Sequence, residues 1–182
     1  MMQYLRFLKA KIITITLLSM ILLGCGFHLR GWGEPIPSYL KNVMVQMKNQ
    51  DSQLQQNLVN TFRSRGAHVV NQSDRAQIKV IIDHVDRSRT LTTVTSSDSK
   101  QYALVYQVTY HVTDASGTTL ITSRQQQAQS TLYTNTSHQL NANAQMNSIY
   151  QSLAESLANQ IVNQIVIKLN QSSDPVSNQT SA

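Results

Sequence analysis

The only cysteine of this 182-residue chain, Cys25, is the residue with the best-defined chemistry. It directly follows an apolar run, residues 12–23, and Gly24. Three basic residues precede the run: Arg6, Lys9 and Lys11. This order of basic, apolar and small residues is typical of a secretory signal peptide, and the run is too short for a membrane-spanning helix. Cleavage after Gly24 would make Cys25 the new amino terminus.

A cysteine at a newly formed amino terminus can be lipidated. Its thiol takes an S-diacylglycerol group and the freed amine can then be acylated, which anchors the protein more stably than one acyl chain does. Leu22, three residues before Cys25, fits a bacterial lipoprotein signal, and Gly26 in place of Asp is typical of lipoproteins released to the outer membrane. We predict a lipoprotein signal peptide over 1–24 and a covalent lipid on Cys25. The alternative is a buried structural cysteine at the end of an uncleaved segment.

No pattern of catalytic residues is evident. The sequence has none of the common hydrolase, metalloprotease or nucleotide-binding motifs. Asp83, His84 and Asp86 could join a serine in a triad, but in so serine-rich a chain a nearby serine is expected by chance. The only two glutamates, Glu34 and Glu155, lie in unrelated segments. We therefore predict no enzyme, no metal site and no dissociable cofactor.

Basic side chains gather in one region of the sequence: Lys79, Arg87, Arg89, Lys100 and Arg124. If this region forms paired strands, some of these side chains converge and could hold phosphate groups. They could equally line a solvated strand edge, where lysine and arginine discourage aggregation. Both interpretations remain open from the residues alone.

The net charge narrows the classes of partner. The whole chain carries +6, but without residues 1–24 it has 12 basic and 9 acidic residues, a net charge of +3 over 158 residues. A nearly neutral mature chain predicts no nucleic-acid partner. Charged residues make up 13% of the chain, about half the usual share. The 41% of apolar residues is enough for one ordinary domain.

Hydrophobic periodicity divides the mature chain into strands and helices. Glycines and prolines keep the acylated amino terminus and a tether, residues 25–41, irregular. The expected elements are a strand over 43–47, a helix over 53–65, strands near 67–70 and over 76–87 (two strands, or one long bent strand), strands over 101–113 and 118–132, and a helix over 140–169.

Specific residues mark the ends of these elements. Asp51 or Ser52 can cap the first helix, and Gly66 suits the position after its end. The Ser- and Thr-rich region 88–99 is expected to be an exposed turn. Gly117 is expected to close a short hairpin.

The order β-α-β-β-β-α predicts an α+β fold with two layers. One mostly antiparallel sheet of about four strands would carry both helices on one face, because neither helix can bury its apolar stripe alone. An apolar row in the 101–113 strand, from Tyr102 to Val112, supplies that surface. We expect a single domain over 42–170, followed by a disordered tail over 171–182.

Two segments of this chain resemble the opening of the LptE family of lipopolysaccharide-assembly lipoproteins. They are Cys25-Gly26-Phe27-His28-Leu29-Arg30-Gly31 and Ile36-Pro37-Ser38-Tyr39-Leu40-Lys41-Asn42-Val43. The first directly follows the predicted cleavage site, and the second leads into the first strand. The order of elements over residues 20–170 also resembles that family.

The resemblance implies a partner and a place in the cell. Such proteins are anchored by their lipid to the periplasmic face of the outer membrane of Gram-negative bacteria. They sit one-to-one inside the lumen of LptD, a β-barrel that inserts lipopolysaccharide into the outer leaflet, and they plug that barrel and assist its assembly. The composition is compatible with this, because amides and hydroxyls suit a polar lumen better than charges do.

The resemblance also implies roles for individual residues. Packing or partner contacts are expected from the opening motif: Phe27, His28, Leu29 and Arg30. The family contacts lipopolysaccharide through basic residues before its Tyr-rich strand, where this chain has Lys100; Arg87 and Arg89 are further candidates. A second basic region of the family, near the start of the last helix, has no basic residue here over 140–146.

Two other classes of function remain open. One is a generic envelope lipoprotein that binds or scaffolds another outer-membrane component. The other is an anchored periplasmic hydrolase, which would require a nucleophile and a base in contact.

Overall fold

The residues that the computed structural model describes are 36, 41–96, 99–135 and 139–173. The chain divides into two compact units, Met1–Trp32 and Gly33–Ala182, and every described residue belongs to the second. The predicted signal peptide, Cys25 and the opening motif Phe27–Arg30 therefore lie outside the described residues.

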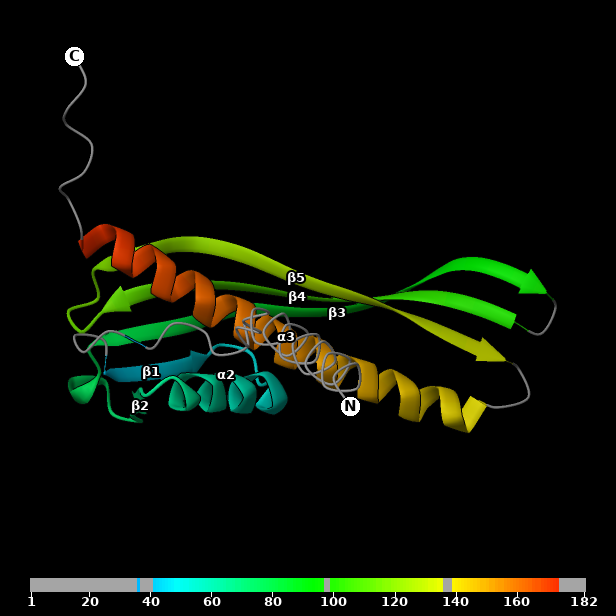
Figure 1. Cartoon of the computed structure of the whole chain (residues 1–182), viewed down its shortest axis with the longest axis horizontal. Helices are drawn as coiled ribbons and strands as arrows, with labels where there is room; N and C mark the ends of the chain where they lie inside the picture. Colours follow the sequence, from blue (N-terminus) through cyan, green and yellow to red (C-terminus); the bar gives the residue numbers. More distant parts are fainter. Residues whose placement is uncertain (1–35, 37–40, 97–98, 136–138, 174–182) are drawn as a thin grey trace, which may run out of the picture. The chain divides into compact units, whose positions relative to one another are not determined.

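Five strands and two long helices form the described part of the second unit (Figure 1). A short 3₁₀ helix, η2, lies between the second and third strands. The bounds are β1 Asn42–Met47, α2 Ser52–Ser64, β2 His68–Val69, η2 Ser73–Arg75, β3 Ile78–Ser96, β4 Ser99–Asp114, β5 Thr119–Asn135 and α3 Gln139–Ser173. The predicted α+β fold is confirmed, with five strands in place of about four.

The five strands form one sheet in the order β2-β1-β3-β4-β5. β3, β4 and β5 are antiparallel neighbours, whereas β1 runs parallel to both β2 and β3. The segments near 67–70 and over 76–87 are therefore two strands, and they lie on opposite sides of β1.

The ends of α2 follow from two residues of the sequence. Asp51 is the N-cap, and its Oδ1 accepts a hydrogen bond of 3.0 Å from the backbone N–H of Leu54. Gly66, just after the helix, has a φ of +89°, which other residues rarely adopt. The buried stripe of the helix is Leu54, Leu58, Thr61 and Phe62. The prediction from capping and periodicity is confirmed.

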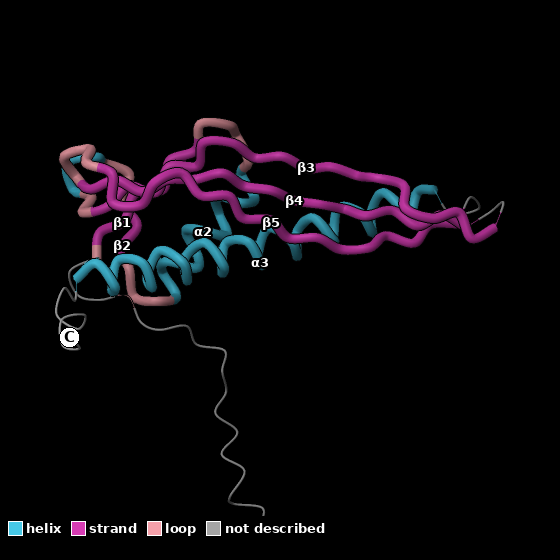
Figure 2. Tube along the Cα trace, turned by 90° about the horizontal axis from the view of Figure 1, so that it is seen from above, coloured by secondary structure: helices cyan, strands magenta, loops and turns pink. Residues whose placement is uncertain are grey.

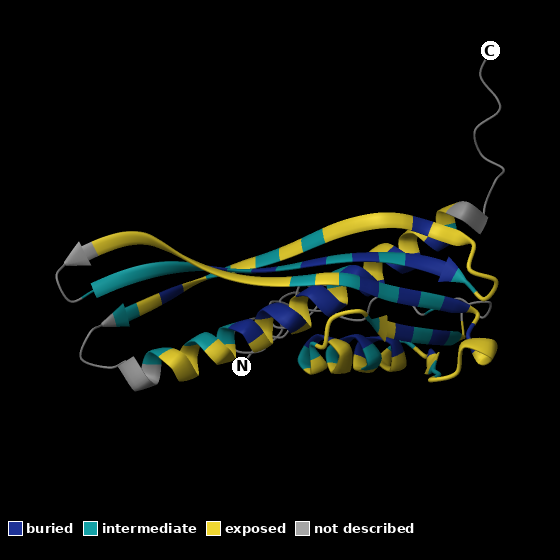
Figure 3. Ribbon diagram, turned by 180° about the vertical axis from the view of Figure 1, so that it is seen from behind, coloured by how far each residue is buried: buried dark blue, intermediate teal, exposed yellow. Residues whose placement is uncertain are grey.

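Both helices cover the same face of the sheet (Figure 2). The buried row that β4 turns toward them is Leu104, Tyr106, Val108, Tyr110 and Val112. The main buried positions of α3 are Leu153, Leu157, Ile161, Ile165 and Leu169. In Figure 3 these appear as dark blue bands between the layers, while the outer surface of each helix is exposed. Burial of both apolar stripes against one sheet face is what holds the two layers together.

The expected exposed turn over 88–99 was wrong. β3 continues to Ser96 and stays paired with β4 along this stretch, from Ser88 opposite Val105 to Ser96 opposite Ser99. Threonine is β-branched and fits a half-exposed strand well, so a Thr-rich segment can extend a ladder as readily as form a loop. The three long strands therefore extend well beyond the region where β1 pairs with β3 (Figure 1).

Candidate functional site

A β-bulge in β3 reverses which side chains face the helices. Pairing with β4 shifts between Ile82, opposite Tyr110, and His84, opposite Thr109, so that Asp83 is the extra residue. Before the bulge the even-numbered residues of β3 face the helices. After it the odd-numbered residues do as far as Leu91, because Arg87 lies opposite Tyr106 and directly opposed residues share a face. A second shift between Leu91 and Thr93 returns the even-numbered Val94 to the helix side.

Asp83 itself joins two strands on the helix-free face. Its carboxylate lies 2.6 Å from Nζ of Lys48 and 2.5 Å from Nδ1 of His111. Burial tends to raise the pKa of Asp83, but the hydrogen bonds and charges of these two partners outweigh it and lower that pKa. Asp83 thus pairs with His111 and not with the adjacent His84, and within the described residues no serine hydroxyl hydrogen-bonds to either imidazole. This arrangement gives no support to a hydrolase triad.

Beyond the bulge, Arg87 enters a polar network with Asp51 and Tyr106. Arg87 Nη2 donates to Asp51 Oδ2 at 2.5 Å, and the Tyr106 hydroxyl donates to the same oxygen at 2.6 Å. The other carboxylate oxygen of Asp51 caps α2. One side chain therefore joins the start of α2 to the middle of β3 and β4.

Tyr150 of α3 completes this network from the other helix. The Arg87 guanidinium lies over both aromatic rings, 4.7 Å from the Tyr106 centroid and 5.8 Å from that of Tyr150. The two rings meet edge to face at 6.3 Å, and the Tyr150 hydroxyl donates to the backbone oxygen of Ser88 at 2.9 Å. Two helices and two strands are thus tied at one place.

The network also sets the charge state of its members. Burial tends to raise the pKa of Asp51, but the hydrogen bonds from Tyr106 and from the Leu54 N–H and the charge of Arg87 outweigh it, so the pKa is lowered. Burial and the hydrogen bond to Asp51 raise the pKa of Tyr106. At neutral pH the carboxylate is therefore ionised and the phenol neutral. An open polar pocket of about 560 Å³ borders this network, lined by Asn49, Gln50, Asp51, Ser52, Gln53, Val85 and Arg87.

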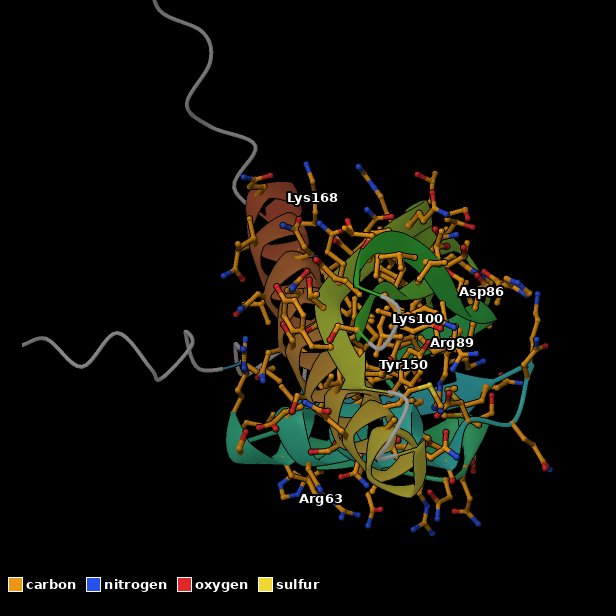
Figure 4. All side chains as sticks on the ribbon, turned by 90° about the vertical axis from the view of Figure 1, so that its right-hand side faces the viewer. Arg63, Asp86, Arg89, Lys100, Tyr150 and Lys168 are labelled. Carbon is orange, nitrogen blue, oxygen red and sulfur yellow. The ribbon has the colours of Figure 1, made fainter. Side chains whose placement is uncertain are left out.

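The distal strip is the group of side chains on the helix-side face near the end of β3 and the start of β4: Arg89, Leu91, Val94, Lys100 and Tyr102. Arg89 lies over the Tyr102 ring at 4.9 Å, and its Nη1 is 4.0 Å from Sδ of Met146 in α3. Lys100 is paired opposite Val94, which places both on this face. The side chains of Leu91 and Val94 are 48% and 55% exposed. Figure 4 looks onto this end of the sheet and labels Arg89 on β3, Lys100 on β4 and Tyr150 on α3.

The structure brings together some of the basic residues noted in the sequence but not all of them. Arg87, Arg89 and Lys100 share the helix-side face of β3 and β4. Lys79 lies on the other face, where its Nζ donates to the backbone oxygen of Ala115 at 3.0 Å. Arg124 lies opposite Tyr110 near the other end of β5.

Sequence reasoning missed the contacts that orient Arg87. The sequence marks Asp51 only as a possible helix cap and Tyr106 only as part of the apolar row, and it does not single out Tyr150. The available signal was a change of phase in the apolar pattern of β3, which runs through Ile82 on even positions and resumes at Val85 on an odd one.

Two features are absent from the described residues. No group of three or more His, Cys, Asp or Glu side chains there is arranged to hold a metal ion. Neither long helix in that part of the chain has an apolar stretch of the length needed to cross a bilayer.

Comparison with known families decides the assignment. The LptE profile, described as lipopolysaccharide assembly, matches residues 40–165. The chain belongs to the LptE family. Membership gives this chain a role in lipopolysaccharide assembly. The LptE family consists of non-enzymatic lipoproteins of the Gram-negative envelope and has no known cofactor. Its members partner with LptD.

Solved structures agree with the LptE fold. Lipoprotein B from Nitrosomonas europaea has a TM-score of 0.66 at 20% identity, covering 80% of this chain and 93% of that one. Rare lipoprotein B from Shewanella oneidensis has a TM-score of 0.62 at 10% identity, covering 73% and 99%. A minor lipoprotein from Acinetobacter baumannii has a TM-score of 0.59 at 19% identity, covering 72% and 95%. No curated protein matches the chain in sequence.

Proposed function

We propose that this chain is a lipid-anchored outer-membrane protein that occupies the lumen of an LptD-like β-barrel, one-to-one. There it assists assembly of the barrel and takes part in moving lipopolysaccharide to the outer leaflet. The observation that carries the proposal is the LptE match over residues 40–165, which covers nearly all of the described domain.

The surface of the domain supports a position inside a polar lumen. The exposed side of α3 is formed mainly by amides and hydroxyls, with Glu155 and Lys168 as the only charged residues between Gln139 and Leu169. Such groups can hydrogen-bond to a polar wall, and they cost less to desolvate than charges do.

The anchor in this proposal is the lipid on Cys25. The side chains Phe27, His28, Leu29 and Arg30 would follow directly after it and make packing or partner contacts. Two or three acyl chains on one residue provide stable insertion into the inner leaflet of the outer membrane.

The proposal is tested by purifying the tagged, full-length lipoprotein from its native membrane in mild detergent. We expect a stable one-to-one complex with a large, heat-modifiable β-barrel, because a folded plug inside a closed barrel can leave only slowly. An unrelated tagged outer-membrane lipoprotein, purified in parallel, controls for adventitious capture. Recovery of the chain alone, from a membrane that contains the barrel, would reject the plug in favour of the generic envelope lipoprotein.

The distal strip is the contact that we propose for lipopolysaccharide. It offers the cations Arg89 and Lys100 to phosphate groups beside exposed apolar side chains, an arrangement that suits an amphiphile. Within the described residues no carboxylate forms a salt bridge with either cation. Arg87 lies beside the strip, but its guanidinium is already paired with Asp51, so we expect it to contribute less to binding of lipopolysaccharide than Arg89 and Lys100 do.

Removing the cations of the strip should weaken binding of lipopolysaccharide. Arg89→Ala and Lys100→Ala are each expected to lower the affinity about three- to tenfold, since each removes one partly solvated ionic contact. Titration of labelled lipopolysaccharide into the purified protein measures this. Lys79→Ala removes the same charge from the opposite face and is the matched control. Equal losses for Lys79→Ala and Lys100→Ala would reject the strip as the site.

A further inference from the structure

The sheet has four stretches of open edge within the described residues, one of which is the part of β1 beyond Val43 that β2 leaves unpaired. β2 and β5 are the outermost strands. β3 becomes a third edge beyond Ile82, because the pairing with β1 ends there. An open edge presents unpaired backbone N–H and C=O groups that another extended chain can pair with, so natural proteins usually protect it.

Three of the four edges are short or carry such protection, and the free part of β1 comprises only residues 44–47. β2 is only two residues long, His68–Val69. The free part of β3 has charged side chains at Asp86, Arg87 and Arg89, and its ladder is interrupted by three register shifts. Short length, charge and bulges are the devices that prevent strand addition.

β5 has none of these devices over most of its length. From Gln125 to Asn135 it contains no charged residue, no proline and no glycine. Its register with β4 is unbroken from Asn135, opposite Ser99, to Arg124, opposite Tyr110. Tyr133, near the carboxyl-terminal end of β5, is 67% exposed. This is a long, regular and unprotected edge in a protein whose other edges are short or protected.

We infer that the outer edge of β5, residues 125–135, pairs with an extended segment of the partner polypeptide, which adds a sixth strand to the sheet. The occupant follows from the edge itself, because only an extended backbone presents donors and acceptors at the spacing of a β-strand. The exposed side chains on the helix-free side of this edge are Gln125, Gln127, Gln129, Thr131 and Tyr133. Amide, hydroxyl and phenol groups suit an uncharged strand beside them. The inference rests on the proposed function for the identity of the partner.

Amide hydrogen exchange on the full-length lipoprotein, alone and in the purified barrel complex, tests the inference. In the free chain the amides of β5 that point away from β4 should exchange fast, whereas in the complex they should slow by at least about tenfold, because they gain strand partners. The free edge of β3, residues 84–96, serves as the internal control and should change less. A complex in which the 125–135 amides exchange as fast as in the free chain would overturn the inference and leave the proposed function standing.

Two matched double variants test the same edge by charge. Gln127→Lys with Gln129→Lys places two cations on the helix-free side of β5, and we expect at least about a fivefold lower yield of complex, since lysines at an edge oppose strand addition. Ser88→Lys with Thr90→Lys places them on the same sheet face at the β3 edge and should leave the yield unchanged. Circular dichroism of each free variant confirms that it is folded. Equal yields from both pairs would overturn the inference.

Two further outcomes would also overturn it. Protection of β5 that rises with the concentration of the free chain would assign the edge to a second copy of this protein. Failure to recover any complex from wild-type protein would reject the proposed function, and the partner strand with it.

Discussion

Replacement of Asp51 by alanine is expected to lower the free energy of unfolding by about 2–4 kcal/mol, because the variant loses a helix cap and the buried carboxylate that accepts from two polar side chains. One carboxylate oxygen accepts the Leu54 N–H, and the other accepts from Arg87 and Tyr106. The Asp51 side chain is only 10% exposed, so water can replace little of what is lost. Urea denaturation of the mature protein, followed by circular dichroism, measures the difference.

Two neighbouring variants separate the parts of this effect. Asp51→Asn keeps an oxygen that can cap α2 but removes the charge, and should cost roughly 1–2 kcal/mol. Ser52→Ala changes the adjacent exposed residue and should cost less than about 0.5 kcal/mol. An Asp51→Ala protein as stable as Ser52→Ala would show that the network contributes nothing to the fold.

The pH dependence of the same comparison has a defined sign. The pKa of Asp51 is lowered in the folded protein, so its contribution is fully present above the unfolded-state pKa, near 3.8, and is lost as the pH falls through the folded value. The stability difference between wild type and Asp51→Asn should therefore be constant above about pH 5 and shrink as the pH falls below the unfolded-state value. A difference that stays constant as the pH falls below that value would indicate that the ionised carboxylate is not the stabilising form.

Replacement of Cys25 by serine is expected to abolish lipidation, because a hydroxyl does not take the place of the thiol that accepts the diacylglyceryl group. With no acyl chain attached, molecules outside a barrel have no stable anchor, so when the chain is produced in excess of the barrel we expect its outer-membrane fraction to fall from nearly all of the protein to the share that the barrel retains. Labelling with a radioactive fatty acid, together with membrane fractionation, measures both effects.

The position of the thiol provides the control. A double variant, Cys25→Ser with Ser38→Cys, still has one cysteine but no longer has it after the predicted cleavage site. It should be as free of lipid as the single variant. Fatty-acid label on either variant would contradict the assignment of Cys25 as the lipidated residue.

The elements with strong periodicity were predictable from the sequence. The α2 helix has a cap at Asp51 and a glycine at 66, and the alternating row of β4 and the long stripe of α3 each indicate one buried face. These signals are local, so they do not depend on the rest of the chain. The division of residues 67–87 into β2 and β3 is not local, because it depends on which strands β1 pairs with.

The polar network could not be predicted in the same way. Arg87 faces the helices only because Asp83 inserts one residue into β3, and its partner Asp51 lies far away in the sequence. The sequence predicts only that some of its five clustered basic residues converge on paired strands, and the register places Arg87, Arg89 and Lys100 on one face. The exclusion of Lys79 from that face again depends on the bulge.

The bulge at Asp83 has a consequence for how the family can vary. Deletion of Asp83 itself would remove the bulge and leave Arg87 and Arg89 on the helix side, because Ile82 and His84 already lie opposite consecutive residues of β4. With the bulge in place, deletion of one residue between it and Arg87 would instead turn both arginines to the helix-free face. The side of the sheet that carries positive charge is therefore encoded by strand length as well as by residue identity. Relatives aligned by residue type alone could share these arginines and present them to opposite surroundings.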